Sequence, residues 1–585
     1  MKVSYRYQKL VVIFLIGGWI FTASGCAKNL VRQQISLQAY PIATDVVTTL
    51  QRTIVPGTKP ATEIHLMELA KYQALGYGSW TFGAPLEALK RTDIMPAFYN
   101  DAKVIKKVRL LKFFTISDIH ITDKESPAQL IYLQRLHPTL SVGASVYSGI
   151  MLFTTQVLDA AVQTINALHK KESFDFGISL GDTCNSTQYN ELRWYIDVLD
   201  GKVIIPSSGA HLGAGNIDYQ RSFQAVGLDK TIPWYQTLGN HDHFWMGSLP
   251  VNDFLRQSYV SDTVLATGDL LSNPTKINTP DYYMGVLDGT TIYGDIKFAG
   301  PVVDFKHPPR IVADPNRRSL KRDAWIKEFF NTSTKPVGHG FNLTKANNGF
   351  ACYSFIPKST VPLKVIVLDD TQREDDGSAD IHGHGFLDQA RWDWLKKELA
   401  DGDAAGELMI IAAHIPLDVE VTAPNSEMGW WTDPKNAVTL LDLVTELQSH
   451  PNLLLWVSGH RHLNTVKAFI SPDPVNAPEK GFWQVETSSL RDFPQQFRIF
   501  QIYLNSDNTI SILTTNVDPA VKAGSLAARS RSYAIATEQI VGADIYNFNP
   551  THDSTIKPMP TASYNAELFK QLTPAMQKKL KTMRL

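Results

Sequence analysis

The chain has 585 residues, of which 44% are apolar and 19% charged, so it can bury a substantial core. This length exceeds that of a usual single domain and predicts either one large domain with insertions or two domains. The formal net charge of −1 and the pI near 7.0 leave no basic footprint, so we expect no nucleic-acid partner.

The first residues have the pattern of a bacterial export signal. Lys2, Arg6 and Lys9 precede an apolar run, 10–23, and small residues then lead into Cys26. This order predicts a signal peptide over residues 1–25, and the Cys after Ser-Gly resembles a lipobox, in which that Cys is acylated. The alternative is an uncleaved membrane anchor, but the run is shorter than the about 20 residues of a comfortable span. We therefore expect an exported protein that is lipid-anchored to the membrane through Cys26 and faces the periplasm or the cell exterior.

Residues 26–110 carry no chemical motif and form a predicted N-terminal extension. Beyond them, five apolar runs have the composition of buried strands, and each ends in a polar turn: 113–117, 176–180, 233–237, 408–413 and 453–458. The carboxyl ends of such strands are where open α/β sheets place their chemistry. The polar residues there are, in chain order, Asp118, His120, Asp182, Asn240, His241, Asp242, His414, His460 and His462. Because oxygen and imidazole ligands of a metal converge from separate elements, this set predicts a metal site.

The segments between these strands predict helical cover and large insertions. Helical spacing of apolar residues over 157–168 predicts an amphipathic helix on one face of the sheet. Residues 246–361, broken by Gly and Pro, form a predicted insertion. A strand at 364–368 leads into acidic residues, 369–376, interpreted as a solvated loop, and a helix is expected to begin at Gly385. Strands at 482–487, 497–504 and 509–515 precede a predicted C-terminal appendage, 516–585.

The five polar turns read DxH, GD, GNHD, H and GHxH, an order that resembles the signature of the calcineurin-like metallophosphoesterase superfamily. The resemblance covers about residues 112–505, and the strand at 364–368 with its Gly-x-Leu-x-x-Gln-x-x-Trp-x-Trp-Leu helix also fits it. It implies an α/β fold, a four-layer αββα sandwich of two mixed β-sheets flanked by helices, with large insertions. The metallophosphoesterase domain is then expected over residues 111–515.

The resemblance also implies a ligand set for two divalent ions, which could be Mn, Fe, Zn or Co because the ligands are nitrogen and oxygen atoms without thiolate. One ion would be held by Asp118, His120, Asp182 and His462, and the other by Asp182, Asn240, His414 and His460. Asp182 would bridge the two ions. Purple acid phosphatases of the same superfamily have Tyr three residues after the bridging Asp, where this chain has Asn185, so no iron–tyrosinate site is expected.

The expected activity is dinuclear metal-dependent hydrolysis of phosphate esters, by attack of a metal-bound hydroxide on a phosphomonoester or phosphodiester substrate. His241 remains outside the ligand set and is predicted to protonate or hydrogen-bond the leaving oxygen, with Asp242 holding its imidazole. The alternative is a catalytically inactive surface binding lipoprotein that retains the fold.

Two further pairs of residues leave alternatives open. Arg461 lies between two predicted ligands and is expected to be structural, whereas Arg491 could contact a substrate phosphate or, more simply, form a surface salt bridge. Cys184 and Cys352 could form a disulfide in an oxidising compartment, although Cys184 is more simply interpreted as a buried residue near Asp182.

Overall fold

The computed structural model describes residues 37–140, 146–374, 383–417, 431, 435–545, 548–551, 555 and 562–582. The chain divides into two compact units, 1–37 and 38–585, and the predicted signal peptide and Cys26 lie outside the described residues. The elements below all belong to the second unit. Among its described helices, none combines the length and the apolar character needed to cross a membrane.

A seven-stranded sheet carries the first three polar turns. Its strand order is β3 (Leu89–Arg91), β22 (Ala566–Lys570), β21 (Ile510–Val517), β20 (Phe497–Asn505), β4 (Lys106–Ile116), β5 (Phe176–Ser179) and β8 (Trp234–Gln236). Strands β4, β5 and β8 are parallel neighbours, whereas β20 runs antiparallel to both β4 and β21. The turns after β4, β5 and β8 therefore meet at one edge of the sheet.

A six-stranded sheet carries the other two polar turns. Its order is β14 (Tyr353–Phe355), β15 (Leu363–Val367), β16 (Leu408–Ala412), β17 (Leu453–Ser458), β19 (Phe482–Glu486) and β18 (Val466–Phe469). Strands β15, β16, β17 and β19 are parallel, and the two outer strands are antiparallel to their neighbours. All five strands predicted to end in polar turns are thus confirmed.

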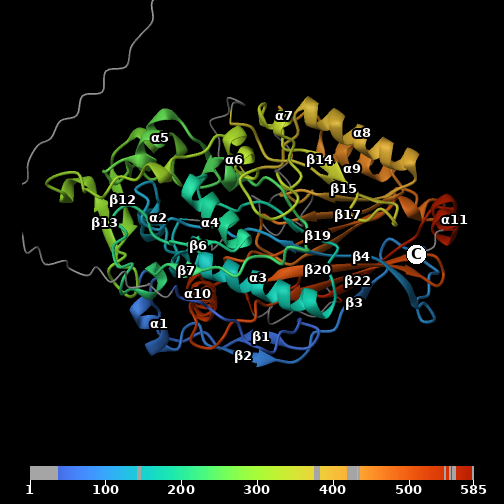
Figure 1. Cartoon of the computed structure of the whole chain (residues 1–585), viewed down its shortest axis with the longest axis horizontal. Coiled ribbons are helices and arrows are strands. Elements are labelled where there is room, and N and C mark those ends of the chain that lie inside the picture. Colours follow the sequence, from blue (N-terminus) through green and yellow to red (C-terminus); the bar gives the residue numbers. More distant parts are fainter. Residues whose placement is uncertain are drawn as a thin grey trace, which may run out of the picture. The chain divides into compact units, whose positions relative to one another are not determined.

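Alternating side chains of the six-stranded sheet divide between two hydrophobic clusters. Ile366, Ile411 and Trp456 pack in a cluster with residues of α8 (Gln389–Ala405) and α9 (Leu440–Ser449), which lie over this sheet in Figure 1. The residues next to them in the strands, such as Val365 and Val457, instead join the cluster that contains the seven-stranded sheet. A period of two is what a strand buried on both faces requires.

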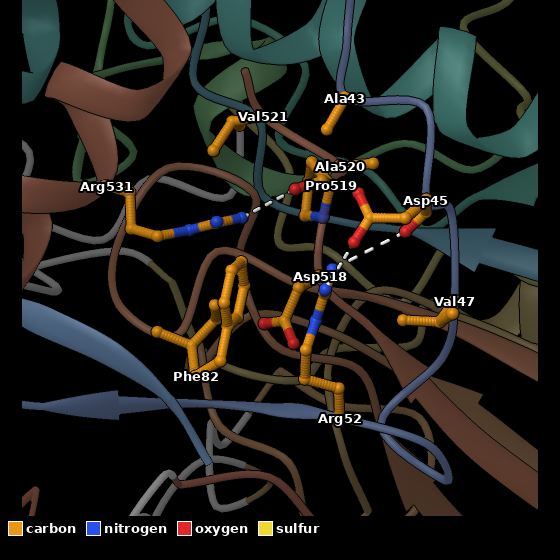
Figure 2. Close-up of a pocket in the computed structure, with 11 residues that line it drawn as sticks. Ala43, Asp45, Val47, Arg52, Phe82, Asp518, Pro519, Ala520, Val521 and Arg531 are labelled. Atoms are coloured by element: carbon orange, nitrogen blue, oxygen red, sulfur yellow. Dashed lines mark hydrogen bonds and ion pairs between the residues drawn. The ribbon is translucent and has the colours of Figure 1, made fainter. Parts of the chain in front are cut away.

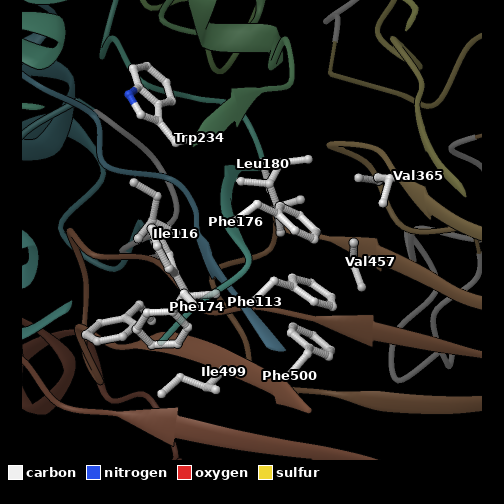
Figure 3. Close-up of a cluster of buried hydrophobic side chains, with 14 of the residues drawn as sticks. Phe113, Ile116, Phe174, Phe176, Leu180, Trp234, Val365, Val457, Ile499 and Phe500 are labelled. Atoms are coloured by element: carbon white, nitrogen blue, oxygen red, sulfur yellow. The ribbon is translucent and has the colours of Figure 1, made fainter. Parts of the chain in front are cut away.

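The space between the two sheets is filled largely by aromatic rings (Figure 3). Phe113 stacks between Phe176 and Phe500, with ring centroids 4.8 and 4.7 Å apart, and Val365 and Val457 face them from the six-stranded sheet. The helices α3 (Thr154–Lys171) and α4 (Tyr189–Asp200) pack against the seven-stranded sheet. The layers are therefore helix, sheet, sheet and helix, and the predicted αββα class is confirmed.

Segments on either side of the motif-bearing strands complete the sheets. Strand β3 comes from residues 26–110, and β22 comes from residues 516–585. Residues 246–361 form a separate three-stranded sheet of β11 (Ala266–Thr267), β12 (Tyr282–Leu287) and β13 (Ile296–Pro301), yet they also supply β14 to the six-stranded sheet. The helix expected from Gly385 begins at Gln389, because the Asp388 side chain caps it by accepting from Arg391 N–H.

The remaining elements surround this sandwich. The N-terminal part holds β1 (Thr53–Pro56), α1 (Leu69–Leu75) and β2 (Trp80–Gly83), and the C-terminal part holds α10 (Leu526–Val541) and α11 (Pro574–Thr582). The other short elements are α2 (Ile131–Leu136), β6 (Val203–Ile204), β7 (Phe223–Gln224), β9 (Phe244–Trp245), β10 (Leu249–Pro250), α5 (Asp253–Val260), α6 (Arg322–Glu328) and α7 (Leu343–Ala346).

Candidate metal centre

The two sheets bring their polar turns together where their parallel strands end. Asp118, His120, Asp182 and His414 are all at most 2% exposed, so the carboxylates and imidazoles meet in the interior. Five of the seven predicted ligands have a positive φ, a left-handed backbone that is uncommon outside glycine: Asp118, His120, Asp182, His460 and His462. Backbone strain of this kind clusters at functional sites.

One group of ligand atoms forms around His120. Its Nε2 lies 3.1 Å from His462 Nε2 and 3.7 Å from Asp182 Oδ2. His462 Nε2 also lies 3.4 Å from Asp118 Oδ1. These atoms converge on a common space of the size that one ion with nitrogen and oxygen ligands occupies.

A second group forms around His414. Its Nε2 lies 2.9 Å from Asn240 Oδ1, 3.2 Å from Asp182 Oδ2 and 3.2 Å from His460 Nδ1. Asp182 Oδ2 therefore faces both groups, while Asp182 Oδ1 accepts a hydrogen bond of 2.8 Å from His241 N–H. The structure thus brings all seven predicted ligands together and places Asp182 between the two groups.

Hydrogen bonds on the far side of these side chains orient their free lone pairs toward the other predicted ligands. His414 Nδ1 bonds to Leu180 O at 2.7 Å, and His462 Nδ1 bonds to Asp492 Oδ2 at 2.6 Å, which leaves Nε2 of each ring facing the other ligands. Asn240 Nδ2 donates to Gly247 O at 2.9 Å, so its carbonyl oxygen points the same way. Carbonyl and carboxylate partners of this type fix the tautomer and orientation of metal-binding histidines. The donor set fits divalent cations.

The charges of the site also favour bound cations. Burial lowers the pKa of His414, but the negative charge of Asp182 outweighs burial and raises the pKa to about 10. Burial likewise opposes the rise in the pKa of His462, which Asp118 and Asp492 bring to about 10. The carboxylates therefore favour the protonated forms of His414 and His462 in particular, so positive charge is stabilised next to Asp182 and Asp118.

His241 lies at the edge of the cluster. Its ring centroid is 4.5 Å from that of His120, and its Nδ1 bonds to Asn185 O at 2.7 Å. Gly247 packs on the ring so closely that a Cβ added there would lie 2.2 Å from His241 Nε2. The backbone carbonyl of Asn185 and the contact with Gly247 therefore set the orientation of this imidazole.

Asp242 does not hold the His241 ring, so that prediction is wrong. Its Oδ2 accepts from Asp182 N–H at 3.0 Å and Gly239 N–H at 2.9 Å, and its Oδ1 accepts from the backbone of Thr183 and Cys184. Residues Asn240–Asp242 form one 3-10 turn after β8, and the Asp242 side chain accepts from Gly239 N–H at the start of this turn. Asp242 thus joins the turn that carries Asp182 to the turn that carries Asn240.

Two other acidic residues were interpreted wrongly from the sequence. Asp369 and Asp370 are buried, not part of a solvated loop: Asp369 pairs with Arg322, and Asp370 accepts from the backbone N–H groups of His414 and Ile415. The position of Asp370 directly after a buried strand was the available signal. Asp492, the partner of His462, lies thirty residues farther along the chain, so no local spacing reveals it.

The two arginines differ in role. Arg461 pairs with the buried Glu486, as expected of a structural residue. Arg491 is only 1% exposed, so the surface salt bridge is excluded. Burial is the main cause of the lowered pKa of His241, and the positive charge of Arg491 contributes to it.

The two described cysteines are buried free thiols. Cys184 packs in the cluster between the sheets, and Cys352 packs in the cluster beneath α8 and α9. The disulfide alternative is therefore excluded, and the interpretation of Cys184 as a buried residue is confirmed.

Searches against known proteins gave structural matches alone. No family model matches the chain, and no curated protein matches it. A dimetal phosphatase from Danio rerio is 12% identical, with 70% of this chain and 97% of that chain covered and a TM-score of 0.34. The sulfate thiohydrolase SoxB from Termus thermophilus is 11% identical, with 76% and 63% covered and a TM-score of 0.26. A structure titled PhoD is 10% identical, with 79% and 81% covered and a TM-score of 0.29. All three are distant likenesses in fold.

Proposed function

We propose that the chain is a metal-dependent hydrolase of phosphoric esters of the calcineurin-like metallophosphoesterase type, with two divalent ions at the centre described above. The single observation that carries this proposal is the position of Asp182 Oδ2, which faces His120 on one side and His414 on the other. A carboxylate placed between two groups of ligands can serve two cations and neutralise part of their charge. Bound ions would supply polarisation of the phosphoryl oxygens and a hydroxide nucleophile near neutral pH.

The residues of the chain supply orientation and proton control. Asn240 offers a neutral oxygen, so the group around His414 carries less negative charge than it would with a second carboxylate at this position. The hydrogen bond from His241 Nδ1 to Asn185 O leaves Nε2 as the atom that can hold a proton for a leaving oxygen. Phosphomonoesters and phosphodiesters both present such an oxygen, and both belong to the proposed substrate class.

The test replaces the shared carboxylate. We expect Asp182→Asn, reconstituted with Mn²⁺, Fe²⁺, Zn²⁺ or Co²⁺, to lose bound metal and hydrolysis of p-nitrophenyl phosphate and bis-p-nitrophenyl phosphate together. Asp159→Asn is the matched control, because Asp159 is an equally buried carboxylate on α3 outside the site. Full occupancy by both ions in Asp182→Asn would contradict the bridge. Absence of turnover by the metal-loaded native protein on every ester would favour the inactive binding protein.

We also propose that the protein is exported and anchored to the membrane by acylation of Cys26. The support is the sequence pattern of residues 1–26. We expect labelled fatty acid to be incorporated by the native chain and not by Cys26→Ser, which should accumulate as precursor. Label on the variant would contradict the anchor and leave the metal centre unaffected.

A further inference from the structure

A cavity of about 650 Å³ lies away from the metal centre and includes none of its ligands. Its walls come from α1 and the turn that follows it, from the turn between β12 and β13, and from α10 with the loop before it. These segments belong to the N-terminal extension, the insertion and the C-terminal part. Parts of the chain outside the motif-bearing strands therefore build a common cavity, whose volume falls within the about 300–1,000 Å³ of small-molecule sites.

Several aromatic side chains line this cavity. They are Tyr72, Tyr77, Trp80, Tyr293 and Tyr533. The Trp80 ring is held from one side by the Arg531 guanidinium, whose Cζ lies 5.2 Å from the ring centroid. Figure 2 shows this guanidinium bonded to Pro519 O in a neighbouring hollow of about 30 Å³, which has room for little more than a water molecule. The indole therefore offers a fixed flat surface to the larger cavity.

Polar groups without protein partners also line the cavity. Tyr533 is 8% exposed, and its hydroxyl makes no hydrogen bond to any of the described residues. The Trp80 Nε1–H also makes none within the described part of the chain. Neither polar atom is fully buried, so both open onto the cavity and can bond to a ligand that displaces water there.

The charges at the cavity select against a strongly charged ligand. Arg529 and Asp218 both line it, and they pair with each other at 2.9 Å. The pair has no net charge, yet it presents guanidinium donors beside carboxylate acceptors. A ligand hydroxyl both donates and accepts, so it matches such a pair and the Tyr533 hydroxyl better than a purely donating or purely accepting group does.

We propose that this cavity binds a neutral oligosaccharide. A sugar ring combines an apolar flat face, which packs on Trp80 and the tyrosines, with hydroxyl groups at its edge, which meet Tyr533, Arg529 and Asp218. A fatty acyl chain would leave these polar groups unsatisfied, and a phosphorylated ligand would find no uncompensated positive charge in the lining. The volume of about 650 Å³ leaves room for a short oligosaccharide, since small-molecule sites span about 300–1,000 Å³.

The experiment is calorimetry on the full native chain with cellotetraose, maltotetraose and chitotetraose, and with dodecanoate as the apolar probe. We expect saturable binding of at least one tetrasaccharide with a Kd below about 1 mM and no binding of dodecanoate. Tyr533→Phe removes only the hydroxyl and should weaken that binding about two- to tenfold. Trp80→Ala should weaken it about tenfold or more.

The matched control is Tyr283→Phe, because Tyr283 is a tyrosine of similar burial, 7% exposed, that does not line the cavity. It should bind the tetrasaccharide as the native chain does. Binding of none of the three sugars, binding of dodecanoate alone, or equal affinities of native protein and Tyr533→Phe would each overturn the proposal. None of the three substituted residues is a predicted metal ligand, so we expect metal content and ester hydrolysis to stay unchanged in all three variants, and a failed sugar site and a failed metal site would give different results.

Discussion

Single carboxylates and carbonyl groups determine the orientation of the predicted metal ligands. Asp182 sends one oxygen to the ligand groups and uses the other to accept from His241 N–H. Asp242 accepts from the backbone N–H groups of Asp182 and Gly239, and Asp370 accepts from that of His414; these residues are predicted ligands or, for Gly239, the neighbour of one. Each of these carboxylates accepts several hydrogen bonds. Replacing one of its oxygens should therefore shift the predicted ligands, although the ligands themselves are not changed.

Asp242→Asn should therefore lower metal affinity. The amide nitrogen that replaces one oxygen cannot accept from the backbone N–H groups of Asp182 and Gly239 or of Thr183 and Cys184. We expect metal affinity to fall about 10- to 100-fold, as for other residues that support metal ligands. Asp159→Asn should lose stability without losing metal affinity, so the two variants separate positioning from general destabilisation in a metal titration. Native affinity in Asp242→Asn would contradict the role.

His241→Ala should keep its metals and lose rate according to the leaving group. General acid help is worth about 10²–10⁴-fold, and an alkoxide needs it far more than a nitrophenolate does. We expect kcat to fall strongly on alkyl esters and little on nitrophenyl esters. Metal analysis and the two rate ratios are the measurements. Equal losses on both ester types, with full metal occupancy, would assign His241 to binding of the phosphoryl oxygens instead.

Among the secondary-structure elements, the strands that bear the site are predictable from their amino-acid composition. Apolar runs that end in Asp, His or Asn located β4, β5, β8, β16 and β17, because a buried strand and its polar turn are both local in sequence. The start of α8 was misplaced because the cap at Asp388 competes with the helical pattern before it. The direction of the Asp242 side chain could not be predicted, since it depends on the path of the chain after β8.

The outer side of β8 shows how such an element is held in place. His339, from the insertion, stacks on Trp234 with ring centroids 3.5 Å apart and bonds through Nδ1 to Trp234 O. The backbone of Gln236 donates to His339 O, so the insertion supplies hydrogen-bond partners to the edge of this short strand. Burial lowers the pKa of His339 to about 4.

This lowered pKa makes the attachment of β8 sensitive to acid. The folded state disfavours the protonated imidazole, so the contribution of His339 is complete above pH 6.5 and is lost as the pH falls toward 4. A shift of this size corresponds to about 3 kcal/mol. We expect the free energy of unfolding of His339→Gln, from urea titrations, to fall less between these pH values than that of the native chain. His307→Gln is the control because His307 is exposed, and its free energy of unfolding should decrease over this pH range as much as that of the native chain.

The predicted metal ligands come from both sheets, so bound ions would contribute to the stability of the whole molecule. Asp118 and Asp182 follow strands of the seven-stranded sheet, whereas His414, His460 and His462 follow strands of the six-stranded sheet. Ions bound between them would link the two layers. They would also relieve the electrostatic cost of carboxylates buried in the interior.

Removal of metal should therefore lower the melting temperature. A ligand at 100 times its Kd stabilises the folded state by about 2.7 kcal/mol, and for a chain of this size we expect a decrease of about 2–5 °C on chelation. Calorimetric scans with and without chelator measure the change. Asp182→Asn, which is expected to bind less metal, should show a smaller decrease, and an equal decrease in both proteins would mean that the chelator acts elsewhere.

The sequence does not predict which strands complete the seven-stranded sheet. Strand β22 pairs with β21 on one side and with β3, more than 470 residues earlier, on the other. Pairings at such separations leave no local pattern, whereas the hairpin of β20 and β21 has one, in its alternating residues and its Asn-Ser-Asp-Asn turn.

This placement of β22 also sets an order of events during synthesis. While residues 566–570 are still inside the ribosome, β21 exposes a full row of backbone groups and β3 has no strand to pair with. An unpaired strand edge is a template for association with other chains. Nascent chains that end between residues 517 and 566 already contain every predicted ligand of the metal centre but leave the edge of β21 unpaired, so we expect them to be held by chaperones or to aggregate.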